Sequence, residues 1–308
     1  MMWNIVSDSS CDLRMASFSS ETVRFESVPL RIQVGGQEFL DNDELSVPEM
    51  LTAMAEEKAA SSSACPSPAA FAKAFEAGEC TVCFTISANL SGTYNAAVMG
   101  REMALEEHPE KKICVIDSKA TAGAMVLLIR RAQALMEAAG DDGDFDALFQ
   151  QLHRYQATLR TCFTLENFDN LIKNGRMRPL VGTLLHSLGI HVIADATPEG
   201  TIRVADKARG VNKTYRAITA LMKARLDKEI LLENDANAAA LGEYAAGAGK
   251  GSQSMVAVTL GPGVGGGAII NGKLYTGFNY AGMEIGHFVI EHGGRLCTCG
   301  RRGCFEAY

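Results

Sequence analysis

The sequence lacks the features that would place it in a membrane or on a nucleic acid. No apolar run in its 308 residues reaches the length of a membrane-spanning helix. The amino terminus has no basic region followed by an apolar stretch, so the pattern of a signal peptide is missing. Lys and Arg number 29 against 36 Asp and Glu, for a net charge of −7. We therefore expect neither an integral membrane protein nor a nucleic-acid partner.

The cysteines do not form an even, paired set either. There are nine, scattered singly up to residue 162 and then clustered at Cys297, Cys299 and Cys304. Such a set suits a reducing cytoplasm better than a disulfide framework, so we predict a cytoplasmic protein. The composition is that of an ordinary globular protein, and the length allows two or three domains.

The first two-thirds of the chain repeats the order strand, polar loop, helix. Apolar segments at residues 4–7, 82–86 and 113–116 are typical of buried parallel strands, and helices are predicted at 94–107 and 122–139. This order predicts a parallel α/β sheet. Loops gather at the carboxyl edge of such a sheet, where a helix N-terminus favours an anionic group.

Three hydroxyl-rich loops accompany this pattern, at residues 8–13, 61–68 and 87–93. One pocket could collect all three. The alternative for the third loop is simple N-capping of the next helix by Ser91 or Thr93. Between the loops, residues 28–34 and 37–40 are predicted to form a hairpin, and Ser46 with Glu49 a capping box.

A second domain is predicted to begin near Thr158, after the acidic turn at 141–144. Strands at 161–165, 190–193 and 201–205 and an apolar helix near 180–188 are expected there. Arg176 follows a glycine at a helix end. An arginine there is either a solvated cap or a partner for a carboxylate or phosphate.

Six short motifs occur in order over about residues 1–222: Asp8-Ser9-Ser10-Cys11-Asp12-Leu13, Ser63 to Ser67, Leu90-Ser91-Gly92-Thr93-Tyr94, Val115-Ile116-Asp117-Ser118, Lys173-Asn174-Gly175-Arg176 and Lys207-Ala208-Arg209-Gly210. In these motifs the sequence resembles the DegV family, whose members bind a fatty acid and present it to a fatty acid kinase. The resemblance implies a DegV-like α/β fold that buries a long-chain fatty acid between two domains.

The same resemblance implies where the fatty-acid carboxylate is held. In this sequence the matching positions are Ser63, Ser91 (with Ser87 as a further candidate) and Arg176. The family's usual Thr-Ser-Gln is replaced here by Ser63-Ala64-Cys65. Most of the affinity is expected from the apolar slot, since each buried methylene contributes about 0.8 kcal/mol.

After about Met222 the DegV pattern stops, and four other motifs follow: Glu233-Asn234-Asp235, Gly261 to Gly267, Ala281 to His287, and Cys297 to Glu306. In these the chain resembles the ROK sugar kinases, which are glucokinase-like proteins of actin-like, ribonuclease H-like fold. The resemblance implies that Asp235 is a catalytic base. It implies a sugar site at Asn234, Glu284, His287 and Glu306, and a nucleotide loop at Gly261, Gly263, Gly265 and Gly266.

Without the family, these residues leave alternatives open. Asp235 is either the N-cap of an alanine-rich helix or a general base. The glycine run is followed by a predicted strand at 268–270 rather than a helix, which excludes a dinucleotide fingerprint but allows a phosphate cradle.

The cysteine cluster has the spacing of a metal site. Cys297, Cys299 and Cys304, together with His287 upstream, offer four ligands to a tetrahedral structural zinc. The alternative is three unliganded buried thiols. The ROK resemblance implies zinc at the same four positions.

The sequence thus predicts a composite α/β chain. A DegV-like domain (1–158) and a truncated second domain (159–224) are followed by a partial ROK segment (225–308). We expect a fatty-acid-binding protein, and as the alternative an ATP-dependent sugar kinase. Kinase activity is not expected, because no Asp-x-Gly-x-Thr hairpin precedes Leu231 and the sequence stops at Tyr308, soon after the cysteine cluster.

Overall fold

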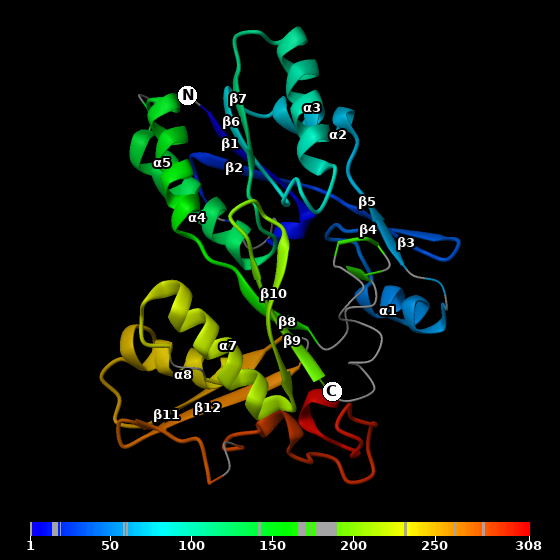
Figure 1. The fold of residues 1–308 in the computed structure, drawn as a ribbon. Coiled ribbons are helices and arrows are strands. Elements are labelled where there is room, and N and C mark those ends of the chain that lie inside the picture. Colours follow the sequence, from blue (N-terminus) through cyan, green and yellow to red (C-terminus); the bar gives the residue numbers. More distant parts are fainter. Residues whose placement is uncertain are drawn as a thin grey trace. The chain divides into compact units, whose positions relative to one another are not determined.

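The computed structural model describes residues 2–13, 18, 20–57, 59, 61–140, 143–165, 171–172, 174–176, 190–230, 233–261, 263–278 and 281–308. The chain divides into two compact units, Met1–Glu229 (unit 1) and Ile230–Tyr308 (unit 2). Figure 1 shows their elements. Within the described ranges, no helix is long and apolar enough to cross a membrane.

Unit 1 begins with a four-stranded sheet in the order β2-β1-β6-β7, and every neighbouring pair in it is parallel. The strands are β1 (Trp3–Asp8), β2 (Val23–Val28), β6 (Cys80–Thr85) and β7 (Lys112–Asp117). The predicted parallel α/β sheet is confirmed. The prediction of one strand over 28–34 is wrong, because the chain leaves β2 at Pro29, which has no N–H for a ladder.

Helices cover both faces of this sheet, and the strand residues alternate between two cores. Ile5 and Val82 pack in the core that includes α4 (Gly123–Ala139) and α5 (Phe145–Thr158). Val6 and Cys83 pack in the core on the α2 (Pro68–Phe75) and α3 (Thr93–Glu107) side. This burial on both faces explains the unbroken apolar runs of the strands.

Helix α5 was not predicted from the sequence. The acidic turn before it supplies its N-cap, since the Asp144 carboxylate accepts hydrogen bonds from the backbone N–H groups of Asp146 and Ala147. Asp144 therefore starts a helix rather than only turning the chain.

A small antiparallel sheet has the order β4-β3-β5, and helix α1 (Val47–Glu56) lies between β4 and β5 in the sequence. Strands β3 (Arg31–Val34) and β4 (Gln37–Leu40) form the predicted hairpin. The expected loop at 61–68 is partly wrong, because β5 (Ser62–Ala64) pairs with β3. The capping box also fails to form, since the Ser46 side chain makes no capping hydrogen bond.

The third sheet of unit 1 is also antiparallel, in the order β10-β9-β8. It comprises β8 (Cys162–Leu165), β9 (Ile190–Ala196) and β10 (Ile202–Arg209), and α7 (Val211–Leu226) follows it. The three predicted strands are confirmed, with β9 and β10 longer than expected. The helix predicted at 180–188 lies outside the described residues.

Unit 2 is built on an antiparallel sheet of β11 (Met255–Leu260), β12 (Val264–Ile270) and β13 (Lys273–Leu274). Helix α8 (Asp235–Ala246) packs against β12. Two short 3₁₀ turns, η6 (Ile285–His287) and η7 (Phe305–Ala307), come from the C-terminal loops.

The glycines of β12 allow close packing on both faces of the strand. A Cβ on Gly267 would lie 2.5 Å from the Ala236 carbonyl oxygen of α8, and one on Gly266 2.5 Å from the Met283 carbonyl oxygen. The strand starts at Val264, whereas the sequence predicted a strand only at 268–270. From Val264 on, the expected phosphate loop is thus strand.

We predict that Gly267→Val destabilises unit 2 by at least about 1–3 kcal/mol, because the added atoms overlap α8. Urea unfolding followed by circular dichroism, with labelling of the fully buried Cys304 thiol as a local readout, measures the effect. The control is Gly242→Ala, where a Cβ meets nothing within 4 Å on an exposed helix face. Unchanged Cys304 labelling in Gly267→Val would contradict this packing argument.

Candidate functional site

Unit 1 contains a cavity of about 990 Å³, which we call the apolar cavity. It is bounded by β8, by the loops after β6 and β7, by β5 and by the turn at 174–176. Its wall is mainly aliphatic and aromatic: Ile32, Ile86, Leu90, Leu127, Leu159, Phe163, Leu165, Leu171 and Ile202. A few polar residues join them, among them Ser61, Ser62, Ser63, Thr121, Arg160, Asn174 and Arg176.

Arg176 lines the apolar cavity on a tight turn. Its backbone N–H donates to the Leu171 carbonyl at 2.8 Å, and the turn passes through Gly175 at φ +72°. The Arg176 Nε donates to the Leu90 carbonyl at 2.8 Å, and Asn174 donates from Nδ2 to the Ser61 carbonyl at 3.1 Å. The arginine is thus half-buried between wall segments rather than a solvated cap.

The three candidate serines have different places. Ser63 lies on β5 and lines the apolar cavity. The Ser91 hydroxyl shares a 2.8 Å hydrogen bond with the Thr93 hydroxyl, and neither Ser91 nor Ser87 is part of the cavity wall. The alternative of N-capping by Ser91 or Thr93 is wrong, because the N-cap of α3 is Gly92.

The loop at residues 86–92, called the β6 loop below, is held from both sides by aspartates of the neighbouring strands. At the end of β1, Asp8 accepts from the backbone N–H of Ile86 at 2.7 Å. At the end of β7, Asp117 accepts from the N–H of Ala88 at 3.0 Å. Burial raises the pKa of Asp8, against the hydrogen bonds from Ser10 and Ile86 that lower it.

The β6 loop also reaches the turn between β9 and β10. Ser87 is buried, and its hydroxyl donates to the Gly200 carbonyl at 2.7 Å. Asn89 donates from Nδ2 to the Glu199 carbonyl at 2.6 Å. Gly200 has φ +84°, and a Cβ there would lie 2.3 Å from the Ser87 hydroxyl. Ser87 therefore joins the parallel sheet of unit 1 to its β10-β9-β8 sheet.

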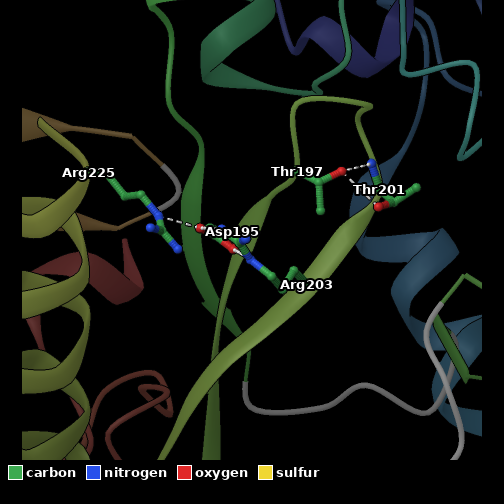
Figure 2. A network of polar contacts seen from close by, with 5 residues as sticks. All are labelled: Asp195, Thr197, Thr201, Arg203 and Arg225. Atoms are coloured by element: carbon green, nitrogen blue, oxygen red, sulfur yellow. Dashed lines mark hydrogen bonds and ion pairs between the residues drawn. The ribbon is translucent and has the colours of Figure 1, made fainter.

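A second cavity of about 600 Å³, the polar cavity, is lined by the loop after β7, the end of α5 and the β9–β10 hairpin. In its wall, Asp195 accepts from Arg203 (Nε 2.8 Å, Nη2 2.6 Å) and from Arg225 (Nε 2.7 Å). Figure 2 shows the aspartate between the two arginines. The hydrogen bonds from Arg203 lower the pKa of Asp195, those from Arg225 add to this, and burial opposes it.

Sequence reasoning missed this network. Arg203 and Asp195 are directly paired across β9 and β10, so opposite charges at that register were the available signal. Arg225 comes from α7, and no local pattern connects it with Asp195.

In unit 2 the four predicted metal ligands come together. The ligand atoms of His287, Cys297, Cys299 and Cys304 all lie within 4.8 Å of one another. The Cys297 Sγ to His287 Nδ1 and Cys299 Sγ to Cys304 Sγ distances are both 3.7 Å. Hydrogen bonds from Arg301 lower the pKa of the exposed Cys299 thiol to about 6.

The residues expected to bind a sugar are only partly gathered. Glu306 lies 3.5 Å from His287 (Oε1 to Nδ1) and accepts from Cys297. Glu284 is exposed and precedes η6. The alternative that Asp235 caps α8 is wrong, since Asn234 is the N-cap and accepts from the N–H groups of Ala236 and Asn237. Asp235 is the first residue of the helix and is exposed.

The glycines expected to bind a nucleotide lie in two settings. Gly261 and Gly263 flank a turn in which the Gly261 N–H donates to the Gly263 carbonyl at 3.0 Å. Gly265 and Gly266 lie inside β12, opposite Thr259 and Val258 of β11.

Comparison with known proteins identifies the larger part of the chain. Residues 2–246 match the family model described as "Uncharacterised protein, DegV family". A DegV domain-containing protein of Streptococcus gordonii is 39% identical over 217 residues, which are 70% of this chain and 76% of the relative. The chain belongs to the DegV family. The DegV match continues to residue 246, past the predicted junction near residue 224, and nothing in it supports a ROK kinase segment.

Solved structures of the family resemble this DegV chain in fold. The Streptococcus pneumoniae Fatty Acid Kinase (Fak) B3 protein, loaded with linoleic acid, has a TM-score of 0.69 and 37% identity, over 73% of this chain and 79% of that one. A DegV protein from Eubacterium eligens, loaded with heptadecanoic acid, has a TM-score of 0.67 and 32% identity, over 72% and 78%.

We predict that Ser87→Ala lowers the free energy of unfolding of unit 1 by about 1–3 kcal/mol, because it leaves the Gly200 carbonyl without its buried donor. Thermal and urea unfolding measure the loss. The matched control is Ser91→Ala in the same loop, where only the hydrogen bond with Thr93 is removed. Equal stability losses in the two variants would show that Ser87 has no special part in joining the sheets.

Proposed function

We propose that this DegV protein binds a long-chain fatty acid in the apolar cavity of unit 1. The observation that carries the proposal is the cavity itself, about 990 Å³ with a mainly aliphatic wall. Volumes of this order are typical of sites for small molecules. An acyl tail gains about 0.8 kcal/mol for each methylene that such a wall removes from water.

The carboxylate is assigned to the part of the wall that carries Arg176 and Ser63. A buried carboxylate is costly unless it is paired and hydrogen-bonded. Arg176 supplies a fixed positive charge, since its Nε is already anchored on the Leu90 carbonyl, and Ser63 supplies a hydroxyl on the same cavity wall. Ser91 and Ser87 are weaker candidates, because neither lines the cavity.

We also propose that the bound fatty acid is presented to a fatty acid kinase, and that this DegV unit has no catalytic role of its own. Support comes from the 37% identical pneumococcal relative, which is named for a fatty acid kinase. The protein in this role is a carrier located in the cytoplasm.

The test begins with lipid extraction and mass spectrometry of the purified protein, followed by titration with palmitate or oleate. We expect a bound long-chain fatty acid, and affinity about tenfold lower in Arg176→Ala, because a hydrogen bond to a charged group is lost. Arg154→Ala is the charge-matched control, since Arg154 is exposed on α5 and outside the cavity wall. If no lipid is extracted and added fatty acid does not bind, the carrier function is refuted.

For unit 2 we propose a structural zinc held by His287, Cys297, Cys299 and Cys304, in a segment of ROK kinase type. The geometry supports it. A tetrahedral zinc with ligand bonds of about 2.0–2.3 Å places its ligand atoms about 3.5–3.8 Å apart, and two of the pairs here are 3.7 Å apart. When bound, zinc would crosslink two loops that carry little regular structure. Sugar phosphorylation is not part of the proposal.

Metal analysis is expected to find about one zinc per chain, as a four-ligand structural site requires. Cys304→Ser should lose the metal and lower the melting temperature. Cys65→Ser, an exposed cysteine in unit 1, is the matched control and should retain the metal. A metal-free protein whose unit 2 is equally stable would contradict the zinc proposal.

A further inference from the structure

The polar cavity has no role in the proposed fatty-acid function, although it is built from side chains of fixed charge. Lys119, Arg160, Arg203 and Arg225 line it, and Asp195 is the carboxylate in the same wall. A hydrogen bond with Thr197 lowers the pKa of the nearby Glu199, and the charges of Lys119 and Arg203 add to this. Four positively charged side chains therefore share the cavity wall with one carboxylate, in a protein whose net charge is −7.

The Asp195 carboxylate positions two of these arginines. Its side chain is only 3% exposed, whereas those of Arg203 and Arg225 are 47% and 35% exposed. Arg203 uses Nε and Nη2 on the carboxylate, and Arg225 uses Nε alone. Within the described parts of the chain, the two terminal nitrogens of Arg225 meet no acceptor.

A third cation is fixed by the end of a helix. Arg160 donates from Nη1 to the carbonyls of Ala157 and Leu159, at 2.8 and 2.7 Å, where α5 ends. Its charge offsets the negative end of the helix while its guanidinium stays at the cavity wall. Lys119 stands in the loop after β7, and its backbone N–H donates to Asp117.

Neutral donors and acceptors complete the wall. Thr161, Thr197 and Gln156 line it with the cations. The Thr197 and Thr201 hydroxyls share a 2.9 Å hydrogen bond, shown in Figure 2, which closes the turn of the β9–β10 hairpin beside the arginines.

From this arrangement we propose that the polar cavity binds a phosphate group. Guanidinium groups held with free N–H edges match the tetrahedral oxygens of phosphate, and each hydrogen bond formed is charge-assisted. The surplus of positive charge favours an anion with more than one negative charge. A cavity of about 600 Å³ is larger than a single carboxylate and suits a small phosphorylated compound.

This site is separate from the fatty-acid proposal. The residues Leu159, Arg160 and Thr161 line both cavities, but Arg176 and Ser63 line only the apolar one, and Arg203 and Arg225 only the polar one. The two functions can therefore fail independently.

The probe is inorganic pyrophosphate, titrated into the full chain by calorimetry at constant ionic strength, with succinate as the carboxylate comparison. We expect pyrophosphate to bind more tightly than succinate. Arg225→Gln should weaken pyrophosphate binding about tenfold, because it removes charge-assisted hydrogen bonds. Lys223→Gln is the matched control, since Lys223 lies in the same last turn of α7, is exposed and is outside the cavity wall.

A second variant separates phosphate binding from folding. Lys119→Gln leaves the Asp195 network intact and should also weaken binding, with an unchanged melting temperature. Sedimentation with phosphatidylcholine vesicles containing phosphatidylglycerol distinguishes a lipid head group from a free phosphate. Vesicle binding that is lost in both variants but kept in Lys223→Gln supports the site with a lipid phosphate as its source.

Absence of binding to both pyrophosphate and vesicles overturns the proposal. So does binding that is equal in Arg225→Gln, Lys119→Gln and Lys223→Gln.

Discussion

The carboxylates of Asp8 and Asp117, accepting backbone N–H groups of the β6 loop, are the interactions on which the arrangement of unit 1 depends. A parallel sheet brings the ends of β1, β6 and β7 to one edge but leaves the loop amides there without partners. The two aspartates supply acceptors from either side. A loop held in this way can place Ile86 and Leu90 in the apolar cavity wall and direct Ser87 toward the β9–β10 turn.

Through Ser87 this constraint extends to the β10-β9-β8 sheet. The β9–β10 hairpin meets the β6 loop at Gly200, and the same hairpin carries Asp195 and Arg203 in the wall of the polar cavity. Residues 159–161, between α5 and β8, contribute to both cavities. One short connection thus separates an apolar volume from a cationic one. The two chemistries are kept apart because each cavity draws its distinctive residues from different elements.

Unit 2 is organised by small residues and by the cysteine loops rather than by a large apolar core. The glycines of β12 let α8 and the 283–285 segment approach the strand backbone on opposite faces. On β11, Val256, Val258 and Leu260 point away from the α8 side and stay exposed. In the described residues of unit 2, little buried apolar area is left to stabilise the C-terminal loops, so a crosslink at the four clustered ligands would add stability there.

The sequence by itself determined the parts of this protein that local pattern controls. The apolar runs at 4–7, 82–86 and 113–116 specify buried parallel strands, because only a strand covered on both faces needs apolar side chains on both. The motif order indicated the DegV family, and the spacing of His287, Cys297, Cys299 and Cys304 indicated four ligands that meet. Arg176 was placed in the cavity wall by the same motifs.

Tertiary structure alone decided which polar residues face a cavity and which brace the fold. Ser87 and Ser63 have the same side chain in similar hydroxyl-rich segments, yet one bonds to Gly200, 113 positions away, and the other lines the apolar cavity. Asp195 meets Arg225 from a helix 30 positions later. Such pairings depend on the packing of whole elements, and no local propensity encodes them. The glycines of β12 resembled a phosphate loop in the sequence. Their actual role depends on close contacts with α8 and residues 283–285, which only the tertiary structure shows.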